Sequence, residues 1–434
     1  MSQVVRSFCL GWSGLGRLCS GALLAVCFAH CAGAQTYTWQ ELRQKFEKTN
    51  PTLLAGEDNI AESRAMEITA FLRPNPDFSL AIDGTQLASY DGVYRPFAGT
   101  QYSPAFSYLH ERQNKRELRL ESAKKGTSIA ESQQEDLKRN LLFNLRSAFV
   151  TALQAKAVLD VAKENLVYYD HVLEISQEQL KAGDIAKVDM MRLDLQRVQY
   201  ESDIQSALVN VRTAKIQLLA LLNDRTPVDR FDVTGPFDFT EVITTLDDIH
   251  RIALDARPDL RAAIQAVDKA KTDHQLAVSN GSTDPTWSVW ITHNPSFNNP
   301  FDNNTIGASV DIPLRLFDRN QGEKERTEID IRRNQRLRDA ATAQVYSDVD
   351  SAWATVESNV ALLRPYKAKY LEEAASVRDT ITFSYQRGGA SLLDFLSAEN
   401  DYRSVRLNYL NLVGAYLTAA SQLNLAVGRE VITQ

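Results

Sequence analysis

Cysteine is confined to the start of this 434-residue chain. All four cysteines lie within its first 31 residues: Cys9, Cys19, Cys27 and Cys31. Two arginines, an apolar run over residues 18–29 and the small residues Ala32-Gly33-Ala34 predict that residues 1–34 are a signal peptide. The remaining chain would then hold no disulfide and no thiolate metal site. Lipid attachment at Cys31 is not expected, because His30 and Phe28 fit a lipoprotein signal poorly.

Several other features are also missing from the sequence. No window after the signal offers the roughly 20 uncharged apolar residues of a spanning helix. Lysine and arginine form no basic block, so no nucleic-acid partner is expected. The histidines are widely spaced without an i, i+4 pair, which argues against a metal site or a cofactor. No nucleophile–base set or phosphate loop is present, so the chain is not expected to be an enzyme.

Proline is absent from residues 112–182, and Gly126 is the single helix breaker there. Apolar or small residues recur every seven positions in this stretch, with a second row four positions before each, as in a coiled coil. The pattern predicts one helix of about 70 residues, or roughly 100 Å. A turn at Gly183 and a returning helix to Leu222 would follow.

The chain contains an internal repeat. An offset of 205 positions pairs Gly183 with Gly388 and Asp189 with Asp394. A shorter helical stretch with a proline break occurs in each half, at Pro51 and Pro258. The long helix of the second half contains Pro365, which should kink or break it. The predicted organisation is therefore a first repeat over 35–222, a linker over 223–245, a second repeat over 246–428 and an end segment over 429–434.

Each repeat also contains two segments whose apolar residues alternate with polar or small ones. These predict strands at about 77–83, 101–109, 286–292 and 305–312. Their lengths approach those of membrane strands, although small soluble hairpins remain an alternative. The aromatic residues of these segments suit either an interfacial girdle or a packed core: Tyr102, Tyr108, Trp287 and Trp290.

Four membrane strands cannot close a barrel, and lipid does not satisfy the backbone groups of an open sheet edge. Eight strands from two copies would leave an interior filled with side chains. Three copies would give twelve strands, so a homotrimer is the smallest assembly with an open pore.

The combination of these features resembles the TolC family of outer-membrane efflux channels. The segment Pro313-Leu-Arg-Leu-Phe-Asp-Arg-Asn320-Gln-Gly322 is similar to a pattern in the cobalt-zinc-cadmium branch, while the first-half counterpart at 111–116 lacks the glycine. The resemblance implies a mostly α fold with a membrane β part. Duplicated helical hairpins would form a periplasmic α-barrel, and four strands per chain would contribute to a twelve-stranded trimeric β-barrel. It also implies outer-membrane lipid around the strands, and a periplasmic adaptor and an inner-membrane efflux pump as partners.

The resemblance places the periplasmic entrance at the two glycine turns. The tips that would contact the adaptor are Gly183, Asp184, Gly388 and Gly389. The candidate gate residues are Asp394, Tyr385, Ser397 and Asp189. Asp394 matches the first of two entrance aspartates of the family, while Ser397 replaces the second and Ala390 replaces the arginine that partners the tyrosine. Three copies of Asp394 would favour cations. Alternatively, Asp394 is a solvated residue that complements the dipole of its helix.

The sequence thus predicts the outer-membrane channel of a tripartite efflux system, with metal cations as the favoured cargo. A duct of the same architecture for drugs or proteins is the first alternative. A secreted coiled-coil structural protein is the second; it explains the long helices but neither the paired strands nor the repeated glycine turns.

Overall fold

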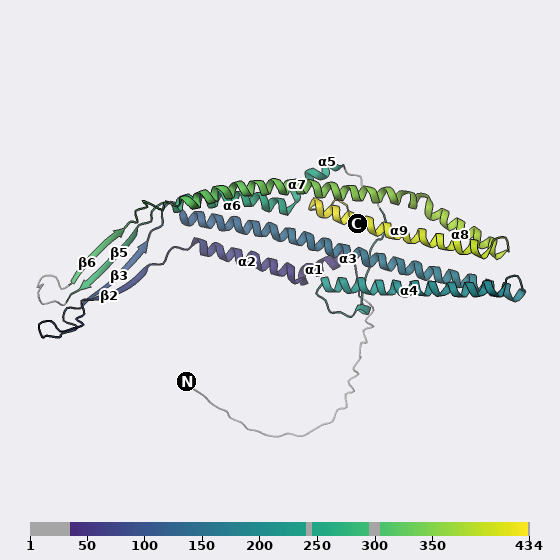
Figure 1. The fold of residues 1–434 in the computed structure, drawn as a ribbon, viewed down its shortest axis with the longest axis horizontal. Coiled ribbons are helices and arrows are strands. Elements are labelled where there is room, and N and C mark those ends of the chain that lie inside the picture. Colours follow the sequence, from purple (N-terminus) through teal and green to yellow (C-terminus); the bar gives the residue numbers. More distant parts are fainter. Residues whose placement is uncertain (1–34, 240–244, 295–303, 433–434) are drawn as a thin grey trace, which may run out of the picture.

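The computed structural model describes residues 35–239, 245–294 and 304–432. The molecule is a long rod, with a β-sheet at one end and, at the other, two turns that each connect a pair of helices (Figure 1). The predicted signal peptide lies outside the described residues. Most of the chain is helical, which confirms the predicted fold class of a mostly α protein with a small β part. No helix in the described ranges is long and apolar enough to cross a membrane.

The first half forms the lower layers of the rod in Figure 1. Helices α1 (Trp39–Thr49) and α2 (Pro51–Phe71) lead to strands β2 (Asp77–Asp83) and β3 (Gln101–Leu109). Helix α3 (Lys115–Ala182) then runs back along the whole rod, and α4 (Lys187–Leu221) returns beside it. We call α3 and α4 the first helical hairpin.

The second half repeats this order. Helices α5 (Leu246–Ala256) and α6 (Pro258–Asn280) precede strands β5 (Thr286–His293) and β6 (Asn304–Asp311). Helix α7 (Gln321–Pro365) ends in a π-helical turn, Tyr366–Tyr370, which confirms the break predicted at Pro365. The rod continues through α8 (Leu371–Gln386), and α9 (Leu392–Val427) returns. We call α7, α8 and α9 the second helical hairpin.

The short helices begin where side chains cap them. Thr38 and Glu41 form a capping box at α1, since each accepts a hydrogen bond from the backbone of the other. Asn50 caps α2 by accepting from the amides of Thr52 and Leu53, and Pro51 occupies the first helical position. At α6 the equivalent position is Arg257, whose side chain makes no cap.

The four long strands form one antiparallel sheet in the order β2-β3-β5-β6. The two β-hairpins of the repeats therefore join through β3 and β5, where Phe106 pairs with Val289. One face carries apolar side chains that are exposed in the single chain: Phe78, Leu80, Ile82, Phe106, Trp287, Val289, Ile291, Ile306 and Val310. The other face carries Trp290 among mostly small and polar residues, and there Ser103 and Thr292 form a hydrogen bond of 3.0 Å. This alternation is the pattern of a sheet with two different environments.

The two tryptophans of β5 lie on opposite faces. Trp287 belongs to the apolar face, whereas Trp290 covers Gly307 of β6, with which it is paired in the sheet. A Cβ atom at Gly307 would come within 2.4 Å of the Trp290 ring. Only glycine leaves room for the ring in this position.

We therefore expect Gly307→Val to destabilise the sheet by about 1–3 kcal/mol through overpacking. The heat stability of the purified protein would measure this, and a second substitution, Trp290→Ala, should restore part of the loss. Gly322→Ala is the control, because nothing lies within 4 Å of a Cβ there. A Gly307→Val protein as stable as wild type would refute the steric explanation.

The sequence analysis missed two short strands. β1 (Gln35–Tyr37) pairs in parallel with β4 (Phe231–Val233), which lies in the linker after a 3₁₀ turn, Val228–Arg230. Three-residue strands carry too little alternation to be recognised. Together with Leu42, Phe46 and Leu218 they close a core in the middle of the rod, while a second core lies between α5, α7 and α9.

Candidate functional site

The two tips of the rod have the same backbone structure. Gly183 has φ +87°, and its amide donates to the carbonyl of Leu180. The amide of Asp184 donates to the carbonyl of Gln179. In the second half Gly388 has φ +73° and donates to Tyr385, while Gly389 reaches Ser384. Both are Schellman turns, in which glycine takes the left-handed conformation that ends a helix. The atoms of Gly183, Asp184, Gly388 and Gly389 form the exposed ends of the molecule.

The helices that follow the turns begin differently. At α9, the Ser391 side chain accepts from the Asp394 amide, and the Asp394 carboxylate accepts from the Ser391 hydroxyl at 2.7 Å and amide at 3.1 Å. These hydrogen bonds lower the pKa of Asp394. At α4 the position equivalent to Ser391 is Ala186, which cannot cap. Asp189 is therefore free of a capping box and lies 3.7 Å from Arg192.

Asp394 thus caps the start of α9, a local role in addition to the dipole interaction that the sequence suggested as the alternative to a gate. The carboxylate is nevertheless exposed, so capping and a place at the entrance are compatible. Ser397 is also exposed, on the next turn of α9. Ala390, in the position of the family's arginine, packs against the apolar cluster of the tip.

That cluster contains a stack of four aromatic rings from all four helices of the tip. Tyr385 of α8 stacks on Phe395 of α9, with 5.1 Å between the ring centroids. The Phe395 centroid lies 6.5 Å from that of Tyr169 of α3, and Tyr169 stacks on Tyr200 of α4 at a centroid distance of 4.6 Å. The Tyr169 hydroxyl donates to the carbonyl of Leu193. We call these four residues the aromatic stack. It ties the two helical hairpins together directly behind the turns.

Burial raises the pKa values of the tyrosines of this stack, and at Tyr385 the charge of Asp189 adds to the effect. The structure therefore brings two predicted gate residues, Tyr385 and Asp189, from different repeats into one layer. Asp394 and Ser397 lie on the neighbouring exposed surface.

Polar contacts between the helical hairpins follow the stack along the rod. Gln179 donates to the carbonyl of Gln386 at 2.7 Å, and Tyr168 donates to Thr382 at 3.0 Å. Further along, Arg403 of α9 forms an ion pair with Asp203 of α4 at 3.0 Å. Glu399, one turn before Arg403, is buried. Sequence analysis missed this layer, because its members acquire partners only when the hairpins pack.

The predicted structural motif residues occupy the ends of helices. Pro51 and Pro258 start α2 and α6. Asn320 precedes α7 in the left-handed conformation, φ +60°, and donates to the carbonyl of Ala277. Its first-half equivalent, Asn114, has φ +51° before α3. Pro313 and Gly322 are exposed on either side of this turn.

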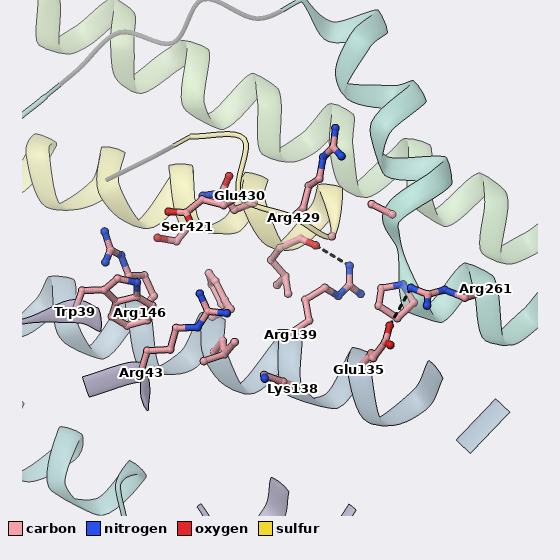
Figure 2. A pocket seen from close by; sticks show the side chains of 17 residues that line it. Trp39, Arg43, Glu135, Lys138, Arg139, Arg146, Arg261, Ser421, Arg429 and Glu430 are labelled. Atoms are coloured by element: carbon pink, nitrogen blue, oxygen red, sulfur yellow. Dashed lines mark hydrogen bonds and ion pairs between the residues drawn. The ribbon is translucent and has the colours of Figure 1, made fainter. Parts of the chain in front are cut away.

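A pocket of about 440 Å³ lies in the middle of the rod, between α1, α3, α6 and the end of α9 (Figure 2). Its cations are mostly paired within the chain: Arg261 lies 3.0 Å from Glu135, and Arg139 donates to the carbonyl of Leu425 at 2.7 Å. Arg146 stacks over the Trp39 ring at 4.5 Å. The pocket is a joint between the repeats, remote from the tips.

The different caps at the two tips predict a difference in local stability. Replacing Ser391 with Ala removes a cap worth about 1 kcal/mol, so the first-turn amides of α9 should exchange hydrogen about fivefold faster. Ala186→Ser, which introduces a hydroxyl at the equivalent place, should slow exchange in α4. Unchanged exchange at Asp394 and Phe395 in the Ser391 variant would contradict the capping role.

The fold and the sequence together define the class. Residues 250–429 match the family described as outer membrane efflux protein. This part of the chain is therefore similar to the TolC-like outer-membrane efflux channels, and members of that family are transport ducts. The resemblance predicted from the sequence is thereby confirmed.

Particular relatives agree with this assignment. The chain is 21% identical over 406 residues to the cobalt-zinc-cadmium resistance protein CzcC of Cupriavidus metallidurans, covering 88% of this chain and 87% of that protein. Among solved structures, the fold is similar to the transmembrane channel CusC, with a TM-score of 0.74, 18% identity and coverage of 90% and 92%. It is also similar to VceC of Vibrio cholerae, with a TM-score of 0.71, 16% identity and coverage of 91% and 97%.

Proposed function

We propose that three copies of this chain form the outer-membrane channel of a tripartite efflux system. The four-stranded sheet is the observation that carries the proposal. The outer edges of β2 and β6 pair with no further strand among the described residues, and one face of the sheet is apolar and exposed. An exposed apolar sheet with open edges is stable only if the edges pair and the face is covered.

Pairing between copies satisfies both requirements. Because the sheet has an even number of antiparallel strands, β2 and β6 run in opposite directions, and β6 of one copy can pair with β2 of the next without breaking the pattern. Three copies give twelve strands with the apolar face toward outer-membrane lipid and the Ser103–Thr292 face toward the lumen. The helical hairpins then extend into the periplasm, with the glycine turns at the entrance.

At this entrance Gly183, Asp184, Gly388 and Gly389 offer exposed backbone to a periplasmic adaptor, which links the channel to an inner-membrane pump. Metal cations are the favoured cargo. The name of CzcC describes cobalt, zinc and cadmium resistance for that relative. In this chain, the lowered pKa of Asp394 keeps its exposed carboxylate ionised, and three copies give a negative ring.

Two experiments test the proposal. The detergent-purified protein should be a trimer and form conducting pores in planar bilayers; a monomer without conductance would refute it. A deletion strain should grow poorly on zinc, cobalt or cadmium and normally on dyes and antibiotics. The opposite growth pattern would favour drug export through the same duct.

A further inference from the structure

Glu399 of α9 is a buried acid at the contact between the helical hairpins. Its residue is 5% exposed, and its Oε1 atom has no hydrogen-bond partner. A buried carboxylate without partners is costly, so this packing favours the neutral, protonated acid.

The charged and titratable groups around Glu399 come from all four helices. On its own helix α9, Arg403 lies one turn further on. The others are contributed by α3, α4 and α8. The groups that interact with Glu399 or with its two neighbouring arginines are Tyr168, Tyr169, Tyr200, Asp203, Arg378, Asp379, Tyr402 and Arg403. The two arginines are already engaged: Arg378 donates to Asp379 and lies between the rings of Tyr168 and Tyr402.

Arg403 is the second engaged arginine, and it connects the hairpins. Its guanidinium lies 3.0 Å from the Asp203 carboxylate on α4 and 5.2 Å from the Tyr200 ring centroid. Glu399 and Arg403 are four residues apart on α9, the spacing and order at which an ionised glutamate and an arginine attract each other on one helix face. An ionised Glu399 therefore competes with Asp203 for Arg403.

We propose that Glu399 is a gating residue, whose protonation decides whether Arg403 holds the two helical hairpins together through Asp203 or turns back to Glu399. The protonated acid leaves the Arg403–Asp203 bridge intact and the tip closed. Loss of the proton draws Arg403 away, weakens the bridge and favours separation of the hairpins. This inference rests on the proposed channel with its entrance at the glycine turns.

The acid is poised for this role near neutral pH. Burial raises the pKa of Glu399 to about 7, against the opposing charges of Arg378 and Arg403. In an open tip, where water or Arg403 stabilises the carboxylate, the pKa would return toward about 4.3. The closed form then binds more protons than the open form between these values, so rising pH favours opening until about pH 7 and has little further effect above it.

Bilayer recordings of the full-length trimer from pH 5.5 to 8.5 test the proposal. For wild type, the ratio of open to closed time should rise on the order of tenfold between pH 5.5 and 7 and then level off. Glu399→Gln, which cannot ionise, should stay closed at every pH. Asp203→Asn, which removes the negative charge that pairs with Arg403 on α4, should be open at every pH.

The opposite directions of these two variants separate gating from damage, since a merely disrupted tip would shift both the same way. Glu372→Gln is the matched control, because Glu372 is exposed on α8; it should follow wild type. Trimer heat stability is measured first for each variant. A Glu399→Gln channel with the wild-type pH profile, or an Asp203→Asn channel that shifts toward closure, would overturn the inference. A wild-type protein that never conducts would instead refute the proposed function.

Discussion

Replacing Arg257 with Met should destabilise the protein by about 3 kcal/mol, because Asp348 and the Ala426 carbonyl lose their cation and Asp259 keeps only Arg139, at 3.6 Å. Arg257 is 4% exposed. Its guanidinium binds both carboxylate oxygens of Asp259 at 2.6 and 3.0 Å, Asp348 of α7 at 2.8 Å and the carbonyl of Ala426 at 3.1 Å. One side chain thus joins the start of α6 to α7 and to the end of α9.

The effect should depend on pH in a defined direction. Burial alone would raise the pKa of Asp259, but the hydrogen bonds and charge of Arg257 hold it below its ordinary value. A lowered carboxyl pKa stabilises the fold above about pH 4 and ceases to do so as the pH falls through the folded-state value. The difference between wild type and Arg257→Met should therefore be largest near neutral pH and shrink in acid.

Denaturation of the purified protein at pH 7 and pH 4 measures both claims. Arg251→Met is the control, since the Arg251 side chain is 79% exposed on α5 and pairs with Asp248 within its own helix. Such a surface pair contributes little, so this variant should lie within about 0.5 kcal/mol of wild type. Equal losses of unfolding free energy in the two variants would show that the contacts of Arg257 between α6, α7 and α9 do not stabilise the fold.

The sequence indicates that Arg257 occupies an unusual position, but it does not identify the residues that Arg257 binds. The sequence places Pro258 after a residue that should cap α6, and Asn50 fills the equivalent place before Pro51. Arginine cannot accept a backbone hydrogen bond, so its presence there implied another task. Its partners Asp348 and Ala426 lie 91 and 169 residues away, and only the packed fold identifies them.

The features that sequence analysis predicted well are those fixed by local physics. Gly183 and Gly388 end their helices in left-handed conformations that few other residues adopt. The heptad pattern set the length of α3, and Pro365 set the end of α7. The spacing of Ser391 and Asp394 is also that of a capping box, although the sequence analysis predicted Asp394 as a gate residue.

Features that depend on contacts between residues far apart in the sequence could not be predicted. Nothing in the strand patterns indicates that β3 pairs with β5, because alternation fixes the face of each strand and not its neighbour. Glu399 has an ordinary surface residue type in a helix, and its burial follows from the approach of α3 and α4. The aromatic stack is similar: its four members are dispersed from Tyr169 to Phe395 and meet only at the tip.

Truncating the centre of that stack, by Phe395→Ala, should cost about 3–5 kcal/mol. Phe395 is fully buried and lies between Tyr385 and Tyr169, so its loss removes the contact that joins α8 and α9 to α3. The loss of stability is local to the tip, so the helical hairpins should separate there before the rest of the rod unfolds. Hydrogen exchange should accelerate at the start of α9 and leave the mid-rod core around Leu218 protected.

If the tips form the entrance, the same change should open it. Cells that carry the Phe395→Ala channel should become sensitive to large antibiotics that the outer membrane normally excludes, and the purified trimer should conduct for a larger fraction of time. Leu393→Ala is the matched control, two residues away on the same helix and 76% exposed; it should leave both measurements at the wild-type level. Phe395→Leu keeps most of the apolar volume and should fall between them. Faster exchange at the tip without any rise in conductance would separate the two claims: the aromatic stack would hold the hairpins together, but the constriction of the channel would lie elsewhere along the rod.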